Sequence, residues 1–179
     1  MSKPPADSAL GRLMATLPRA GSVEWIGLRP ARGAVLDEVD SVQALAGAGL
    51  VGDRYAARPG SGKRGVTLIQ AEHLPAIAAL AGHASVAPAQ LRRNVVVAGI
   101  PLAALHDRRF RIGEVVLEGT GPCDPCSQME AALGPGGFNA MRGMGGICAR
   151  IVTGGRLRRG DAVVALADDA DDARAPHHP

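Results

Sequence analysis

The chain has 179 residues, of which 46% are hydrophobic and only 2% aromatic, so one domain with a core of Val, Leu, Ile and Ala is expected. Its net charge of +3 comes without a long Lys/Arg run or many base-stacking aromatics, which argues against a nucleic-acid partner. No apolar stretch reaches about 18 residues, and the start lacks the apolar segment of a secretory signal, so we expect no membrane partner. We therefore expect a cytoplasmic protein whose three cysteines are free thiols.

The predicted elements are short and separated by glycine turns. Residues 1–20 form a lead-in whose apolar side chains at helical spacing predict a short amphipathic helix: Leu10, Leu13, Met14 and Leu17. Strands are predicted, in chain order, at 21–28, 65–70, 95–97, 108–113 and 114–121, with two closing strands at 146–155 and 156–166. Helices are predicted at 71–82 and 127–134, and the acidic residues 167–179 are predicted to be a disordered tail. This order favours a mainly β protein over residues 21–166, a β-barrel with two or three short helices, rather than a doubly wound sheet.

Two basic segments suggest anion binding. The stretch "RPGSGKRG" (58–65) is not a nucleotide-binding P-loop, because Arg64 follows Lys63 where Ser or Thr is needed, and a strand follows where a helix is needed. It is then either an anion-binding loop or a solvated surface loop. In "LRRNVVV", strand alternation would place Arg92 and Asn94 on one face and Arg93 on the other. That pair could grip a phosphate or carboxylate, or it could line a solvated edge.

The stretch "GTGPCDPCSQME" places Cys123 and Cys126 three positions apart, each after a proline. Structural zinc would need a second ligand pair. The chain has one further cysteine, Cys148, but no second C-x-x-C and no H-x-x-x-H motif. A thioredoxin-like site would need a long helix in a βαβ unit, and here a two-turn helix is predicted. Two alternatives stay open. One is a thiolate that carries sulfur or binds a soft metal, and the other is a pair of structural thiols in a turn fixed by prolines.

Five blocks in sequence order resemble the MOSC domain, which occurs at the C-terminus of eukaryotic molybdenum cofactor sulfurases and alone in bacterial proteins. The blocks are "GLVGDR", "GVTLIQAEHL", "LRRNVVVAGIPLAAL", "RFRIGEVVLEGTGPCDPCSQMEAALGPGG" and "GICARIVTGGRLRRGD". The resemblance covers residues 21–166. It implies a β-barrel-like fold that encloses a pocket for a molybdopterin-type molybdenum cofactor.

The resemblance also implies roles for particular residues. In relatives that reduce N-hydroxylated compounds with electrons from a separate reductase, one cysteine thiolate holds the metal, and the matching residue is Cys126. It would be both the catalytic residue and the metal ligand. The matching cofactor contacts are Arg54, Lys63, Arg64, Arg92 and Asn94.

Two other readings stay open. The chain could be a sulfur carrier or cofactor-handling protein that holds a persulfide on Cys126 without redox turnover. It could instead be a binding module for another small anion, with structural thiols.

Overall fold

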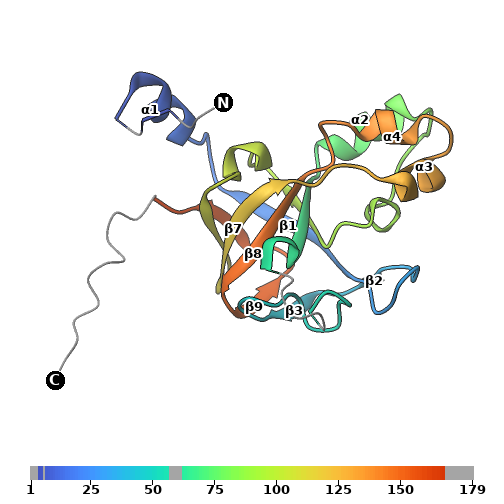
Figure 1. Ribbon diagram of the computed structural model, residues 1–179, viewed down its shortest axis with the longest axis horizontal. Helices are drawn as coiled ribbons and strands as arrows, with labels where there is room; N and C mark the ends of the chain where they lie inside the picture. The colour runs from blue at the N-terminus through green and yellow to red at the C-terminus, as the bar shows by residue number, and fades with distance from the viewer. Residues whose placement is uncertain (1–3, 6, 57–61, 168–179) are drawn as a thin grey trace.

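The computed structural model describes residues 4–5, 7–56 and 62–167, and its centre is a closed β-barrel (Figure 1). Within this described part, seven strands follow one another around the barrel in the order β10-β6-β7-β8-β4-β5-β1, and a β1–β10 pairing closes it. The strands are β1 (Gly21–Leu28), β4 (Val66–Gln70), β5 (Val95–Ala98), β6 (Arg109–Ile112), β7 (Val115–Pro122), β8 (Ile147–Thr153) and β10 (Ala162–Ala165). The predicted mainly β class and the barrel are confirmed.

Strands β4 and β5 are a parallel pair in an otherwise antiparallel barrel. Helix α2 (His73–Leu80) and the 3₁₀ turn η2 (Pro88–Leu91) form the crossover between them. Figure 1 shows α2 gathered with α3 (Ser127–Leu133) and α4 (Gly137–Met141) at one side of the barrel. The other 3₁₀ turns are η1 (Gly62–Arg64) and η3 (Leu102–Leu105).

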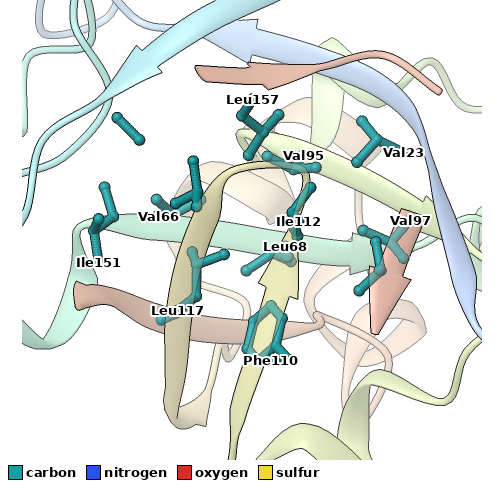
Figure 2. Close-up of a cluster of buried hydrophobic side chains, with 14 of the residues drawn as sticks. Val23, Val66, Leu68, Val95, Val97, Phe110, Ile112, Leu117, Ile151 and Leu157 are labelled. Atoms are coloured by element: carbon teal, nitrogen blue, oxygen red, sulfur yellow. The ribbon is translucent and has the colours of Figure 1, made fainter. Parts of the chain in front are cut away.

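Alternating side chains of β4 and β5 fill two cores. Val95 and Val97 point into the barrel, where Figure 2 shows them with Phe110. Val96, between them, joins a second cluster under the helices with Ile77 and other apolar residues. Successive side chains of a strand face opposite sides, so both faces of β5 are buried and its sequence is a continuous apolar run.

The region from residue 146 to residue 166 differs from the prediction, because it holds three strands, β8, β9 and β10, rather than two. β9 (Gly155–Arg158) leaves the barrel and pairs with β3 (Ser41–Ala44) in a separate two-stranded sheet. The chain then turns at Arg159–Asp161, where Gly160 has φ +85°, and returns to the barrel as β10. The sequence prediction joined β9 and β10 because the turn between them is short. It also omitted β3 and β2 (Asp37–Glu38), which pairs with the end of β1.

The predicted N-terminal helix is present as α1 (Ala9–Ala15), and Figure 1 shows it projecting from the barrel. The helix holds three of the four predicted apolar residues, Leu10, Leu13 and Met14, and all three are exposed; the fourth, Leu17, lies beyond the helix and packs against the barrel core. None of the helices among the described residues is long and apolar enough to cross a membrane. All but the first residue of the acidic tail predicted at 167–179 lies outside the described part of the chain.

Candidate functional site

Asn94 is the centre of a buried polar network beneath the predicted site. Its Oδ1 accepts hydrogen bonds from Thr67 N (3.1 Å) and Thr67 Oγ1 (2.8 Å). Its Nδ2 donates to Gly27 O (3.1 Å) and to Asp53 Oδ2 (2.8 Å). These four bonds use the whole capacity of the amide, and the residue is 2% exposed. In this structure Asn94 therefore has a positioning role, and its predicted contact with a cofactor stays a prediction.

Asp53 connects this network to two arginines. Its carboxylate accepts hydrogen bonds from the backbone N–H groups of Arg29 (3.0 Å) and Tyr55 (2.9 Å). The guanidinium groups of Arg29 and Arg54 lie 5.1 and 5.2 Å from the centre of the Tyr55 ring, within cation–π range. Arg54 was predicted as a site residue, whereas Arg29 was not. Arg29 directly follows β1, but only the folded chain shows that it is buried beside Tyr55.

The predicted common face of Arg92 and Asn94 is wrong, because β5 begins only at Val95. The 3₁₀ turn η2 ends at Leu91, and Arg92 reverses the chain in the left-handed region with φ 57°. Strand alternation does not apply to residues in such a turn. The Arg92 side chain instead reaches Ala34, whose carbonyl accepts from Nη1 at 3.4 Å.

Arg92 lies at a cleft of about 490 Å³ between the loop before β2, η2 and α3. Its Nε is buried and has no hydrogen-bond partner among the described residues. The cleft also carries the amide side chains of Gln90 and Gln128, with alanines of α3 beside them. This lining offers hydrogen-bond donors to an anion and apolar contact to its body.

Arg93 was not among the predicted site residues, yet its guanidinium group joins three segments of the candidate site. Its Nε donates to Gly145 O (2.7 Å), its Nη1 to Leu91 O (3.0 Å) and its Nη2 to Cys123 O (2.8 Å). The side chain is buried, so these three carbonyls satisfy a charge that would be costly to leave without partners. A basic pair before a strand was the only signal for it, and that signal could not separate Arg93 from Arg92.

The structure separates the two thiols of the C-x-x-C. Cys123 is buried at the end of β7, whereas Cys126 is exposed as the N-cap residue of α3. All three cysteines are free, which confirms the prediction of free thiols. No hydrogen bond to the Cys126 sulfur is found among the described residues. It is therefore the thiol that can meet a bound molecule without any rearrangement.

Cys123 and Cys148 are tightly coupled. A hydrogen bond from the Cys148 thiol lowers the pKa of Cys123 to about 6; burial opposes this shift, and the charges of Arg93, Arg64 and Arg29 support it. The same hydrogen bond, together with burial, raises the pKa of Cys148 above its usual range. The sequence analysis considered Cys148 only as a possible zinc ligand and predicted no other role for it.

Lys63 and Arg64 lie exposed on η1, which is tied to β7 by a hydrogen bond from the Thr120 hydroxyl to the Lys63 carbonyl. The positive charge of Arg64 acts on both Cys123 and Cys148. The fold thus brings Arg64 together with the thiols, and Arg54 together with Arg29 on Tyr55, while Arg92 serves the cleft beside α3.

Comparison with known proteins agrees with this geometry. The sequence pattern of the MOSC domain matches residues 55–164, more than half of the chain. The chain belongs to the MOSC domain family. A search among curated protein sequences finds no match.

Several solved structures share the fold of this MOSC domain protein. YuaD from Bacillus subtilis is similar with a TM-score of 0.71 and 19% identity, over 83% of this chain and 97% of that one. YiiM from Escherichia coli is similar with a TM-score of 0.66 and 19% identity, over 86% and 73% of the two chains. YiiM from Geobacillus stearothermophilus has a TM-score of 0.67 and 13% identity, over 84% and 77%. At these identities the likeness concerns the fold.

Proposed function

We propose that this MOSC domain protein binds a molybdopterin-type molybdenum cofactor through the thiolate of Cys126 and reduces N-hydroxylated compounds with electrons from a separate reductase. The observation that carries the proposal is the exposed Cys126 thiol, for which the described part of the chain holds no hydrogen-bond partner, on the segment that begins where Arg93 binds the Cys123 carbonyl. A thiolate is a suitable ligand for a soft metal centre. Membership of a family associated with the molybdenum cofactor supports it.

The donors around the site fit the anionic end of such a cofactor. Arg54 is half-buried and Lys63 and Arg64 are exposed, so their charges can meet a phosphate. Arg29 and Arg92 each have a buried Nε without a hydrogen-bond partner among the described residues. The Arg29 Nε lies 3.5 Å from Asp53 Oδ2, which is long for a hydrogen bond. Buried donors of this kind are stabilised when an acceptor arrives.

The protein alone would not supply a full set of metal ligands. Within the described part of the chain, no three His, Cys, Asp or Glu side chains lie together in a way that could hold a metal ion. A metal at Cys126 would therefore take its other ligands from the cofactor. This matches a group that brings its own coordination and needs one thiolate from the protein.

The chain's own residues hold and orient the segment that carries Cys126 and the arginines near it. Arg93 fixes the carbonyl of Cys123 and so the start of the segment that ends at Cys126. The network of Asn94 and Asp53 keeps Arg29 beside Tyr55, with the Arg29 guanidinium in an ion pair with Asp53. When bound, the cofactor supplies the electron transfer to the substrate.

The test is the metal content of protein purified from a host that makes the cofactor. We expect near-stoichiometric molybdenum and pterin, with the molybdenum lost in Cys126→Ser and retained in Cys123→Ser, the matched control three residues away. Equal molybdenum in the wild type and in Cys126→Ser would rule out Cys126 as the ligand.

A second function rests on the same exposed thiol. Cys126 could carry a persulfide for a cofactor-handling step, because an accessible thiolate can attack and hold sulfane sulfur. Metal-free protein with a labile sulfane sulfur, absent in Cys126→Ser, would favour this function over the reductase.

A further inference from the structure

The pairing of β7 with β8 places Cys123 and Cys148 on one face. Gly121 lies opposite Cys148, and Pro122 lies opposite Ile147. The register continues one residue further, because Cys123 N donates to Gly146 O at 2.8 Å. Cys123 lies one residue beyond β7, and the Cys148 thiol is near enough to donate a hydrogen bond to its sulfur, so the two cysteines are diagonal neighbours at this end of the pair.

Glycines leave the two sulfurs facing each other. The residue directly opposite Cys148 is Gly121, and the residue directly opposite Cys123 is Gly146. Neither has a side chain, so none stands between the two sulfurs from these strands. The Cys148 thiol also has Pro122 O within donor reach at 3.8 Å, so this carbonyl and the Cys123 sulfur are alternative acceptors for its one proton.

The pair is enclosed but close to the surface. Cys123 is 7% exposed and Cys148 3%, yet Pro122 and Asp124 on either side of Cys123 are exposed. Because only 7% of Cys123 is exposed, a reactant at its sulfur must be small, on the scale of a peroxide. The charges of Arg93, Arg64 and Arg29 stabilise a thiolate at Cys123, while the Cys148 thiol remains protonated.

We propose that Cys123 and Cys148 form a redox-active dithiol, distinct from Cys126, that small hydroperoxides convert into a disulfide. The Cys123 thiolate attacks the O–O bond, so a sulfur–oxygen bond forms and hydroxide leaves, giving a sulfenic acid. The Cys148 sulfur then attacks the Cys123 sulfur, the S–O bond breaks, and the oxygen leaves as water with the Cys148 proton. The hydroxide takes a proton from the solvent, so the two sulfurs lose two electrons in total and one hydrogen peroxide becomes two molecules of water.

The bond would move the Cys126 segment. Diagonal neighbours across an antiparallel pair lie about 7–8 Å apart, whereas a disulfide joins Cα atoms about 4.4–6.8 Å apart. Cys123 lies just beyond the last residue of β7, so it is the partner that can move toward β8. A shift of Cys123 would stretch or break the hydrogen bond from Arg93 Nη2 to the Cys123 carbonyl, and Cys126 follows three residues later, so the exposed thiol would move with this segment.

The test uses the reduced, full-length Cys126→Ser variant, in which only this pair of cysteines remains. After treatment with hydrogen peroxide and alkylation, we expect both thiols to be blocked, with a mass loss of about 2 Da per chain. Peptide mapping should find Cys123 linked to Cys148, and dithiothreitol should restore both thiols. The same link is expected in the wild-type chain. In Cys126→Ser/Cys148→Ser, the matched control, Cys123 should stop at sulfenic or higher acids.

Two alkylatable thiols left after peroxide in Cys126→Ser would overturn the proposal. A wild-type disulfide between Cys123 and Cys126 instead of Cys148 would also overturn it. Neither readout depends on molybdenum, so the experiment tests the dithiol independently of the proposed cofactor function.

Discussion

At Cys123, a hydrogen bond outweighs burial. Burial alone disfavours a thiolate, yet the Cys148 donor and the charges of Arg93, Arg64 and Arg29 lower the pKa of Cys123 to about 6. Cys126, three residues later, is exposed and has no such partners. The two thiols of one short motif therefore have different chemistry, and the difference comes from residues distant in sequence.

Removing the donor should reverse this effect. In Cys148→Ala, Cys123 stays buried but loses its hydrogen bond, so its pKa should rise and its thiolate should form only at higher pH. In the wild type the thiolate fraction should grow as the pH rises through about 6. Cys148→Ser keeps a hydroxyl donor and should stay close to the wild type. The measurement is the pH dependence of thiolate ultraviolet absorbance, and unchanged titration in Cys148→Ala would contradict the assignment of the donor.

Arg93 is expected to be the most sensitive polar residue of the site. Arg93→Leu leaves the carbonyls of Gly145, Leu91 and Cys123 without their donor, which should lower the free energy of unfolding by at least about 2 kcal/mol. Arg111→Leu, an exposed arginine of β6, should change it by less than about 0.5 kcal/mol. Urea unfolding measures the free energy change in each variant. Equal changes would argue against a stabilising role for the three hydrogen bonds from Arg93.

At the scale of elements, local patterns predicted where strands and helices lie, and packing decided how they are used. The apolar runs at 66–69 and 95–97 are strands because each buries both faces, in the barrel and under the helices. The turn at Arg92 was missed, since a non-glycine residue with positive φ leaves no signature in the sequence. In α1 the helical spacing was correct, but the apolar face is not covered by the barrel.

The two kinds of apolar residue in and after α1 should respond differently to a polar substitution. Leu13→Ser should change the free energy of unfolding by less than about 0.5 kcal/mol, because Leu13 is 72% exposed. Leu17→Ser should lower it by more than about 1 kcal/mol, because Leu17 packs against the barrel core. A large loss for Leu13→Ser in urea unfolding would show that its side chain is covered in solution.

At the scale of the whole molecule, closure of the barrel makes one cooperative unit. β1 pairs with β10 at Gly21–Val163 and Ser22–Ala162, so the first and last strands of the barrel close it together. Residues from every barrel strand share the core around Phe110 (Figure 2). Damage to this core should therefore destabilise all strands at once, including those that position the site.

The two phenylalanines of the chain give a matched test. Phe110 is fully buried, so Phe110→Ala should lower the free energy of unfolding by about 3–5 kcal/mol. Phe138 is 39% exposed, so Phe138→Ala should lower it by about 1 kcal/mol or less. Both follow from urea unfolding at equilibrium, and a single transition is expected for each variant. Similar losses in the two variants would show that the barrel interior does not dominate stability.

The sequence by itself determined the barrel class, most strand positions and the separation of acidic and basic regions, because alternation, β-branched residues and glycine turns act locally. It also contained the pattern of the MOSC family, and it predicted Arg54, Lys63, Arg64 and Cys126 as site residues. Only the tertiary structure decided that the Asn94 amide is used internally, that Arg29 and Arg93 lie at the candidate site, and that the Cys148 thiol can donate to Cys123. The reason is physical: strand register, burial and long-range hydrogen bonds join residues that no local pattern connects, and these contacts set which thiol is enclosed and which is exposed.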